Sequence, residues 1–519
     1  MRSLRLSTAI VLLSAGTSLA QRNTLSRDHD PVVILGEHLT LLLGLPPGEV
    51  VGFRYEGGWE QIPVQIDERK FADFGVVYGS DPIGLGTMAY VDSLTYTGPD
   101  TDPEFDADDE LVFMAPDAGD RAPTGAVLPG GVFSAPALEV EVVDPLDGGV
   151  GYVYLFQTDG TLDPDANQDY VTYDFVLLAG DYIPNYNNEV GPNPEDSAAV
   201  TPYYRAHFSD RWIRDEMNIY VGGASGADIL DRHKNMFAPG NCGRTEDTFS
   251  GGEGAFFTNK DGPARAIRSY MGANSGPFTQ REHFFYEQRH DVFTFLRVHA
   301  ISGMVDIYDY SPDATGMIYH NDLNPTGVTV DGEPDVVTAG PIIWEMVTGA
   351  QGTLIVINAI ETNIDPFTTT SYYSDDATPS VTQCTGDAYE YASSGTWIDQ
   401  SIPNTDPYLG ATDYLTAHRV EYYEPPGQTV GLAATRSAQA LTPLEFTVGP
   451  YQPSLAGDGD GDGDVDLNDF ATFAMCYGGA AVTTPPGGCS PQEFAASDLD
   501  DDGDVDLGDF ATFANNFTG

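Results

Sequence analysis

The chain is poor in positive charge. Its 519 residues include 22 lysines and arginines against 79 aspartates and glutamates, which gives a formal net charge of -57. A surface this acidic repels a phosphate backbone, so the composition excludes nucleic acid as a partner. It suits surroundings in which divalent cations or salt screen the carboxylates, and this indicates a location outside the cell.

Long apolar runs are missing as well. No stretch of roughly 20 consecutive apolar residues occurs, so no membrane span is predicted. The N-terminus has the pattern of an export signal: Arg2 and Arg5 precede an apolar run at 9–13, and small residues at 18–20 offer a cleavage site before Gln21. We therefore predict that residues 1–20 are a signal peptide and that the mature chain is secreted, either extracellular or at the cell surface.

Cysteine is scarce, with only Cys242, Cys384, Cys476 and Cys489. An exported chain meets an oxidising environment, so two disulfides can form. The economical pairing joins Cys476 to Cys489 and Cys242 to Cys384, although the sequence alone leaves all three connectivities open.

Helical periodicity is nearly absent between residues 21 and 451. Short runs rich in Val, Ile, Tyr, Phe and Thr, such as 137–143 and 151–156, alternate with turns that 57 glycines and 36 prolines supply. The pattern predicts a mainly β protein with one or two antiparallel β-sandwich domains. We place an N-terminal β domain at 21–165, a second sandwich, which could be continuous with the first, at 166–451, a linker at 452–457, and an Asp-rich module at 458–519.

The Asp-rich module contains an internal duplication. The twelve residues 458–469 recur forty residues later as 498–509, and Phe-Ala-Thr-Phe-Ala follows both copies. Glycine occupies position 6 and valine position 8 of each copy. Aspartates occupy positions 1, 3, 5, 7, 9 and 12: Asp458, Asp460, Asp462, Asp464, Asp466 and Asp469 in the first copy, and Asp498, Asp500, Asp502, Asp504, Asp506 and Asp509 in the second.

This spacing is typical of an EF-hand calcium loop. A calcium ion takes about six to eight oxygen ligands at about 2.3 to 2.6 Å from a loop that turns sharply at position 6, where glycine permits the turn. Position 7 contributes its main-chain carbonyl, and position 9 acts through a water. The sequence therefore predicts two calcium ions, one per loop, and makes a disordered acidic tail the less favoured alternative.

The segments 467–477 and 507–517 carry Leu, Phe and Phe at helical spacing, which predicts two helices with a small core of Phe470, Phe473, Phe510 and Phe513. With these helices behind the loops and Asp at position 12, the last 62 residues resemble the type I dockerin repeat. That resemblance implies calcium binding and attachment to a cohesin-bearing scaffold. The forty-residue period and the insertion at 478–490 depart from the family pattern, so the partner stays open between a cohesin-like and another cell-surface protein.

Familiar catalytic motifs are absent from residues 21–451, which we assign to no family. Positive charge is instead concentrated: residues 203–299 hold twelve of the 22 basic residues and five of the nine histidines, interleaved with tyrosines. Arginine binds carboxylates in a bidentate way, so this window could bind an acidic polysaccharide, and a Tyr or His could remove a proton in a β-elimination. The candidate catalytic residues are His283, Tyr286, Arg289 and His299, followed by His207, Arg268 and Tyr270.

Two other interpretations of this window remain. The Arg and His side chains could be cross-strand partners of the plentiful Asp and Glu residues, or they could form a binding surface without catalysis. The leading hypothesis is a secreted, calcium-binding multi-domain protein that binds or degrades an extracellular, acidic polysaccharide. If it is an enzyme, we expect a polysaccharide lyase or a glycoside hydrolase. The alternative is a non-enzymatic cell-surface or matrix protein with an adhesive or structural role.

Overall fold

The computed structural model describes residues 22–517, except 96, 100, 124–125, 166–167, 180–191, 239–241, 275, 379–383, 452–456, 460–464 and 501. The predicted signal peptide and most of the predicted linker lie outside these residues. The rest is mainly β, as the sequence predicts, and forms several sheets whose paired strands are all antiparallel.

The N-terminal module is a small sandwich. One sheet has the strand order β1-β7-β4, a second has the order β27-β8-β9-β2-β3, and β5 and β6 form a hairpin. Alternate apolar residues such as Ile34, Leu111 and Val140 are fully buried between the two sheets. The strand bounds are β1 Pro31–Leu35, β2 Val50–Tyr55, β3 Trp59–Ile62, β4 Gln65–Asp67, β5 Arg69–Asp73, β6 Gly86–Tyr90, β7 Glu110–Met114, β8 Val132–Val143, β9 Val150–Thr158 and β27 Glu445–Pro450.

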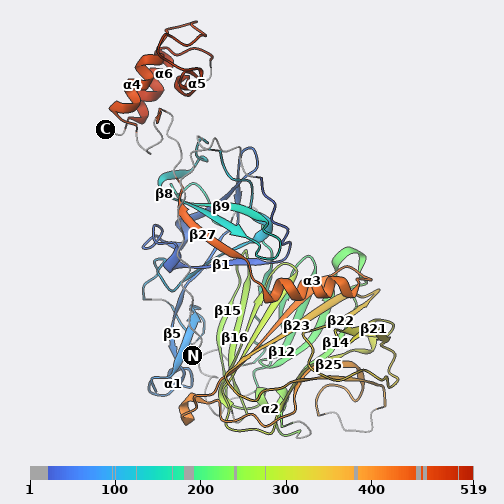
Figure 1. Cartoon of the computed structure of the whole chain (residues 1–519). Coiled ribbons are helices and arrows are strands. Elements are labelled where there is room, and N and C mark those ends of the chain that lie inside the picture. Colours follow the sequence, from blue (N-terminus) through green and yellow to red (C-terminus); the bar gives the residue numbers. More distant parts are fainter. Residues whose placement is uncertain are drawn as a thin grey trace.

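Strand β27 lies in the range predicted for the second domain, yet it belongs to the N-terminal sheet. Its residues Glu445 to Pro450 pair with Val143 to Leu138 of β8. The chain thus leaves the N-terminal module, forms the large module, and returns before the tail begins. In Figure 1 the N-terminal module accordingly lies between the tail and the large module.

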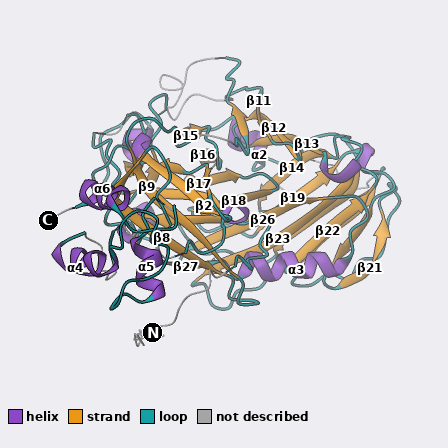
Figure 2. Ribbon diagram, turned by 90° about the horizontal axis from the view of Figure 1, so that it is seen from above, coloured by secondary structure: helices purple, strands orange, loops and turns teal. Residues whose placement is uncertain are grey.

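The large module is built on a nine-stranded sheet of order β15-β16-β17-β18-β26-β23-β22-β20-β21. Two four-stranded sheets, β10-β11-β12-β13 and β14-β19-β25-β24, cover one face, here called the inner face, and share an apolar core with it. Figure 2 shows the long strands of these sheets lying side by side. The bounds are β10 Thr172–Asp174, β11 Ser197–Val200, β12 Tyr204–Asp210, β13 Ile213–Ile219, β14 Leu230–Phe237, β15 Ala255–Lys260, β16 Ala266–Ala273, β17 Gly276–Phe285, β18 Arg289–Leu296, β19 Met304–Tyr310, β20 Ile318–Asn321, β21 Asn324–Thr329, β22 Trp344–Gly349, β23 Gly352–Thr362, β24 Thr370–Asp376, β25 Glu390–Ile398 and β26 Leu415–Glu424.

The opposite, outer face of the nine-stranded sheet is covered by the N-terminal module and by helix α3, Val430–Leu441. The sequence analysis did not expect this helix. It packs Ala433 against Trp344 and Tyr422 and lies along β22 and β23 in both views. Its apolar stripe is short and rich in alanine, so tertiary packing rather than a strong periodic signal stabilises it. The other elements of the β region are α1 Phe74–Val77, α2 Glu246–Ser250, and the 3-10 turns Gly36–His38, Pro47–Glu49, Ala115–Asp117, Val221–Gly223, Pro312–Ala314 and Pro407–Leu409.

The described residues of the tail form three helices, α4 Leu467–Cys476, α5 Pro491–Ser497 and α6 Leu507–Asn516. The first and last are the two helices that the repeat predicts. Phe473 and Phe513 are buried with ring centroids 5.3 Å apart, whereas Phe470 and Phe510 are about two-fifths exposed and only border this core. The expectation of four core phenylalanines is therefore half correct, because Val465, Val505 and the helix α5 fill the remaining space.

Both disulfides join the cysteines of the economical pairing. Cys242 is bonded to Cys384, and Cys476 is bonded to Cys489 within the tail. Among the described residues, no helix combines the length and the apolar character that crossing a membrane requires.

Candidate functional site

The second acidic loop of the tail brings carboxylates together. Ligand atoms of Asp498, Asp500 and Asp502 lie within 4.8 Å of one another. Two oxygens on opposite sides of a calcium ion are about 4.6 to 5.2 Å apart, so this spacing fits the ion. The Asp498 carboxylate also accepts hydrogen bonds from the backbone N–H of Asp502 (3.2 Å) and Gly503 (3.0 Å), which closes the loop.

The last aspartate of each loop has the same contacts in both copies. Asp469 accepts from the backbone N–H groups of Gly459 and Asp466, both at 2.7 Å. Asp509 accepts from the equivalent Leu499 (2.5 Å) and Asp506 (2.7 Å). The bonds from Asp466 and Asp506 belong to the capping boxes at the start of α4 and of α6. The two copies therefore share a local fold as well as a sequence.

The later positions of the second loop form a separate group, in which ligand atoms of Asp504, Asp506 and Asp509 also lie within 4.8 Å of one another. Asp504 is buried, and one of its carboxylate oxygens has no hydrogen-bond partner among the described residues. Such an oxygen is costly to bury unless a cation or water satisfies it. Of the first loop, Asp458 and Asp466 are described together with Asp469, whereas Asp460, Asp462 and Asp464 lie outside the described residues. The all-oxygen donor set suits a hard cation such as calcium, and its binding stays a prediction.

Candidate residues on β16 and β17 point to the inner face. Arg268 is fully buried and pairs with Glu195 through two hydrogen bonds of 2.6 and 2.8 Å. The Tyr270 hydroxyl lies 3.1 Å from Nε2 of His283, whose Nδ1 is 3.0 Å from Nε2 of His290. Burial raises the pKa of Tyr270, and burial together with His290 keeps the pKa of His283 well below its usual range. Both groups are therefore neutral at ordinary pH.

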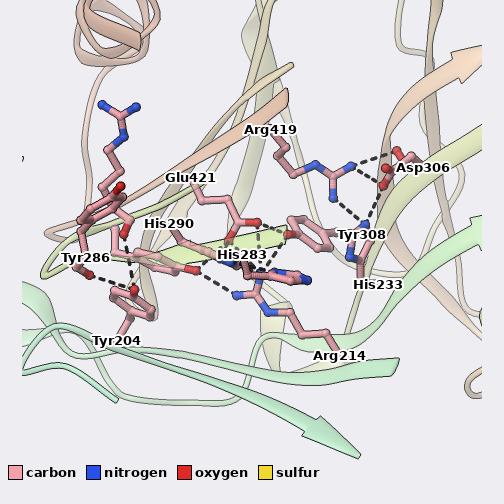
Figure 3. A network of polar contacts seen from close by, with 12 residues as sticks. Tyr204, Arg214, His233, His283, Tyr286, His290, Asp306, Tyr308, Arg419 and Glu421 are labelled. Carbon is pink, nitrogen blue, oxygen red and sulfur yellow. Dashed lines mark hydrogen bonds and ion pairs between the residues drawn. The ribbon is translucent and has the colours of Figure 1, made fainter. Parts of the chain in front are cut away.

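The histidine pair continues into a buried ion pair (Figure 3). Nδ1 of His290 is 3.1 Å from the Glu421 carboxylate, which accepts from Arg214 at 2.8 Å and from the Tyr423 hydroxyl at 2.7 Å. The Tyr308 hydroxyl contacts the same carboxylate. Although desolvation opposes it, Arg214 holds the pKa of Glu421 well below its usual range. An ionised pair is thus enclosed in the core, where breaking it is costly.

A second ion cluster lies beside the first in Figure 3. The Asp306 carboxylate accepts from Arg419 (2.7 Å) and Arg281 (3.2 Å) and lies 2.6 Å from Nε2 of His233. Desolvation lowers the pKa of His233 to about 3, so this imidazole is neutral. The cavity next to the cluster has a volume of about 30 Å³, which is roughly the share of liquid volume of one water molecule. This place has no room for a sugar ring.

Tyr286 and Arg289 lie on the other side of the sheet. They line a cleft of about 400 Å³ between the outer face and the N-terminal module, a size typical of small-molecule sites. Nε and Nη2 of Arg289 donate to Asp291 at 2.6 and 2.8 Å, and Nη1 contacts Asp30. Burial raises the pKa of Tyr286 to about 12.

The same cleft contains a carboxyl group that the sequence analysis missed. Glu282 is 8% exposed, and its Oε1 accepts from Ser269 (3.1 Å) and Gln280 (3.0 Å). No described residue donates to its Oε2. Desolvation raises the pKa of Glu282 to about 7. The alternation of β17 could have separated Glu282 from the inner residues. Along this strand Gln280, Glu282 and Phe284 face the side opposite to Arg281 and His283.

The last two candidates lie at the periphery. His207 on β12 is 2.7 Å from Asp215 and 2.9 Å from Asp196, and the hydrogen bond to Asp215 raises its pKa. His299 is exposed after β18, with Nε2 3.1 Å from Nη2 of Arg244.

The seven candidates therefore do not share one cleft. The inner face holds Arg268, Tyr270 and His283, and the outer cleft holds Tyr286 and Arg289. Neighbouring residues of one strand face opposite sides, so a cluster in sequence is divided by the sheet. Arg268 and Arg289 are both ion-paired, but not across neighbouring strands as one interpretation of the sequence expected, because Glu195 lies outside the nine-stranded sheet and Asp291 is on the same strand as Arg289. A catalytic role for any of the seven remains a prediction.

Comparison with known proteins adds little. No family model matches the chain, and no curated protein matches it. The structure of the protein HI1317 matches with a TM-score of 0.27 and 6% identity over 48% of this chain and 99% of its own. An Escherichia coli K12 protein named "Putative aldose 1-epimerase" matches with a TM-score of 0.24 and 9% identity over 49% of this chain and 100% of its own. Similarity this low carries no argument about fold or function.

Proposed function

We propose that the protein is a secreted, calcium-binding multi-domain protein that binds or degrades an extracellular polysaccharide and is attached through its dockerin-like tail. The observation that carries the proposal is the duplicated acidic loop. Its second copy gathers Asp498, Asp500 and Asp502 at a separation that fits calcium, and both copies lead into a capped helix.

The tail also has a surface suited to attachment. Leu467 and Leu507, the first residues of α4 and α6, are 70% and 69% exposed. Phe470 and Phe510, one turn further along, are also exposed at equivalent positions. Apolar side chains exposed in matching places on two helices favour a protein partner. A cohesin-like or another cell-surface protein would satisfy this requirement.

Calcium removal tests the tail directly. We expect calcium to raise the unfolding temperature of the tail transition in the intact protein, and EDTA to reverse the effect, because binding to the folded state alone stabilises it. Asp458→Ala combined with Asp498→Ala should abolish the response. Asp399→Ala, which removes an exposed aspartate outside the tail, is the matched control. Scanning calorimetry that is the same with calcium and with EDTA would refute calcium binding.

The role of the β region is supported by the outer cleft. It has the volume of a ligand site and contains aromatic and carboxyl side chains. Incubation with a panel of polysaccharides, followed by reducing-end analysis and by ultraviolet absorbance of unsaturated ends, distinguishes a hydrolase from a lyase. Retained binding without either product favours the non-enzymatic adhesive alternative. That alternative is favoured by the burial of Arg268, Tyr270 and His283, which a substrate does not reach in this structure.

A further inference from the structure

The outer cleft is lined by four carboxyl groups, and three of them, Asp30, Glu110 and Asp291, are paired with arginines. The guanidinium of Arg265 is held by Asp67 (2.8 Å) and Glu110 (2.6 Å), and that of Arg289 by Asp291 and Asp30. Glu282, by contrast, forms no ion pair with a described residue and is held only by Ser269 and Gln280.

The Gln280 amide lies between Glu282 and Arg297 and forms a hydrogen bond with each, so the carboxyl group and the guanidinium do not contact each other directly. Nη1 of Arg297 donates to Oε1 of Gln280 at 3.2 Å, and Nε2 of Gln280 donates to Oε1 of Glu282 at 3.0 Å. Arg297 also lies over the Phe295 ring, 5.3 Å from its centroid. Ser269 and Gln280 therefore both donate to Oε1 of Glu282. Its Oε2 is left for a group that enters the cleft.

Aromatic side chains form the adjoining wall. Phe293 and Phe295 of β18 line the cleft and are only partly buried, and Phe446 of β27 closes it from the N-terminal module. Ring faces of this kind pack against the C–H face of a sugar, while its hydroxyls need polar partners such as a carboxylate. A buried carboxyl group next to a partly exposed aromatic wall matches both requirements.

The charges of the cleft exclude an acidic ligand. Its guanidinium groups already have bidentate or paired carboxylate partners, which a ligand carboxylate would have to displace. Asp30, Glu110 and Asp291 would in addition repel it. The polysaccharide expected from the sequence was acidic because arginine is abundant in the basic window of residues 203–299, whereas the two arginines of the cleft, Arg265 and Arg289, are already paired with carboxylates.

We propose that the outer cleft is the saccharide-binding site of the protein, that its ligand is an uncharged saccharide, and that Oε2 of Glu282 accepts a hydrogen bond from a sugar hydroxyl while Phe293 contacts the ring. This inference rests on the proposed function, since it names the place and the ligand class of the polysaccharide binding.

The test uses the full chain and isothermal titration calorimetry with hexasaccharides of cellulose, xylan and mannan, and with hexagalacturonate and chitosan hexamer as charged probes. We expect at least one neutral hexasaccharide to bind, and Glu282→Gln and Phe293→Leu each to weaken that binding about tenfold or more. Glu56→Gln, in an exposed turn, and Phe133→Ala, on an exposed part of β8, are the matched controls and should bind as the native chain does.

The outcomes separate the two proposals. Neutral binding that neither cleft variant changes would overturn the cleft assignment and leave polysaccharide binding in place. Preferential binding of hexagalacturonate or chitosan hexamer would overturn the uncharged ligand. Absence of binding to every probe would overturn this inference, and polysaccharide binding with it if intact polysaccharides also fail to bind. Unchanged circular dichroism and an unfolding temperature that is not lowered in the variants would show that lost binding is not lost folding.

Discussion

The two faces of the nine-stranded sheet carry the same kinds of side chain but use them differently. On the inner face both oxygens of Glu421 accept hydrogen bonds, from Arg214 and from two tyrosine hydroxyls. On the outer face Oε2 of Glu282 accepts from no described residue and lies beside a cleft. A buried carboxyl group whose oxygens are all satisfied stabilises a specific arrangement, whereas one that is partly satisfied has capacity left for a ligand.

The largest expected effect comes from breaking the inner pair. Arg214→Met leaves Glu421 ionised and buried without its cation, and we expect the free energy of unfolding to fall by about 3 to 5 kcal/mol. Urea unfolding of the purified protein measures this. The surface pair Arg54 and Glu60, 2.7 Å apart, is the control, because Arg54→Met should cost less than about 1 kcal/mol.

The double variant Arg214→Met with Glu421→Gln sharpens the same result. It removes the uncompensated charge, so part of the lost stability should return. A loss below about 1 kcal/mol in Arg214→Met alone would show that the inner network is not tightly coupled.

Substitution of the outer carboxyl group, Glu282, should raise the free energy of unfolding rather than lower it. Its pKa is raised from 4.5 to about 7, so between these values the unfolded chain ionises Glu282 while the folded chain keeps the proton. Stability is therefore lost as the pH rises through this window. Glu282→Gln removes the loss and should stabilise the protein by about 2 to 3 kcal/mol at pH 8, and by almost nothing at pH 4. Glu56→Gln should be neutral at both values, and an effect of Glu282→Gln that does not change with pH would contradict the burial argument.

The smallest effect is expected at the periphery. The hydrogen bond to Asp215 raises the pKa of His207, so its contribution to stability is complete below about pH 6.5 and is lost as the pH rises through the raised value. The site is partly solvated, and His207→Gln should cost less than about 1 kcal/mol at pH 5.5 and nothing measurable at pH 9. Thermal unfolding at the two pH values checks this, with the exposed His38→Gln as the reference. An equal loss at both pH values would assign His207 a packing role instead.

Several features followed from local sequence. The β class was predictable from short β-branched and aromatic runs. The two tail helices were predictable from the duplicated acidic loop, because each helix begins near the end of one copy. Helix α5 was missed although Ser490, Pro491 and Glu493 form a capping box with proline at the first turn. Helix α3 was missed because most of the residues that it buries, Arg436, Ser437 and Gln439, are polar, which leaves little periodic apolar signal.

The candidate site was less accessible to sequence reasoning. The window from residue 203 to 299 was recognised, but its carboxyl groups were considered only as partners of the Arg and His side chains, so Glu282 was not singled out as a possible ligand group. Which residues of β17 and β18 face the cleft depends on the strand register and on what covers each face. A shift of one residue would exchange Glu282 with His283, and composition does not report such a shift.

By itself the sequence determined what lies within a dozen residues: the aspartate spacing of each tail loop, the glycine that permits its turn, and the alternation of the strands. Only the tertiary structure decided the partners of the charges, because those are distant along the chain. Arg214 meets Glu421 across 207 residues, and Asp30 meets Arg289 across 259. Local spacing is fixed by backbone geometry. Which of the 79 carboxylates pairs with a given arginine depends instead on which strands the sheets bring next to each other.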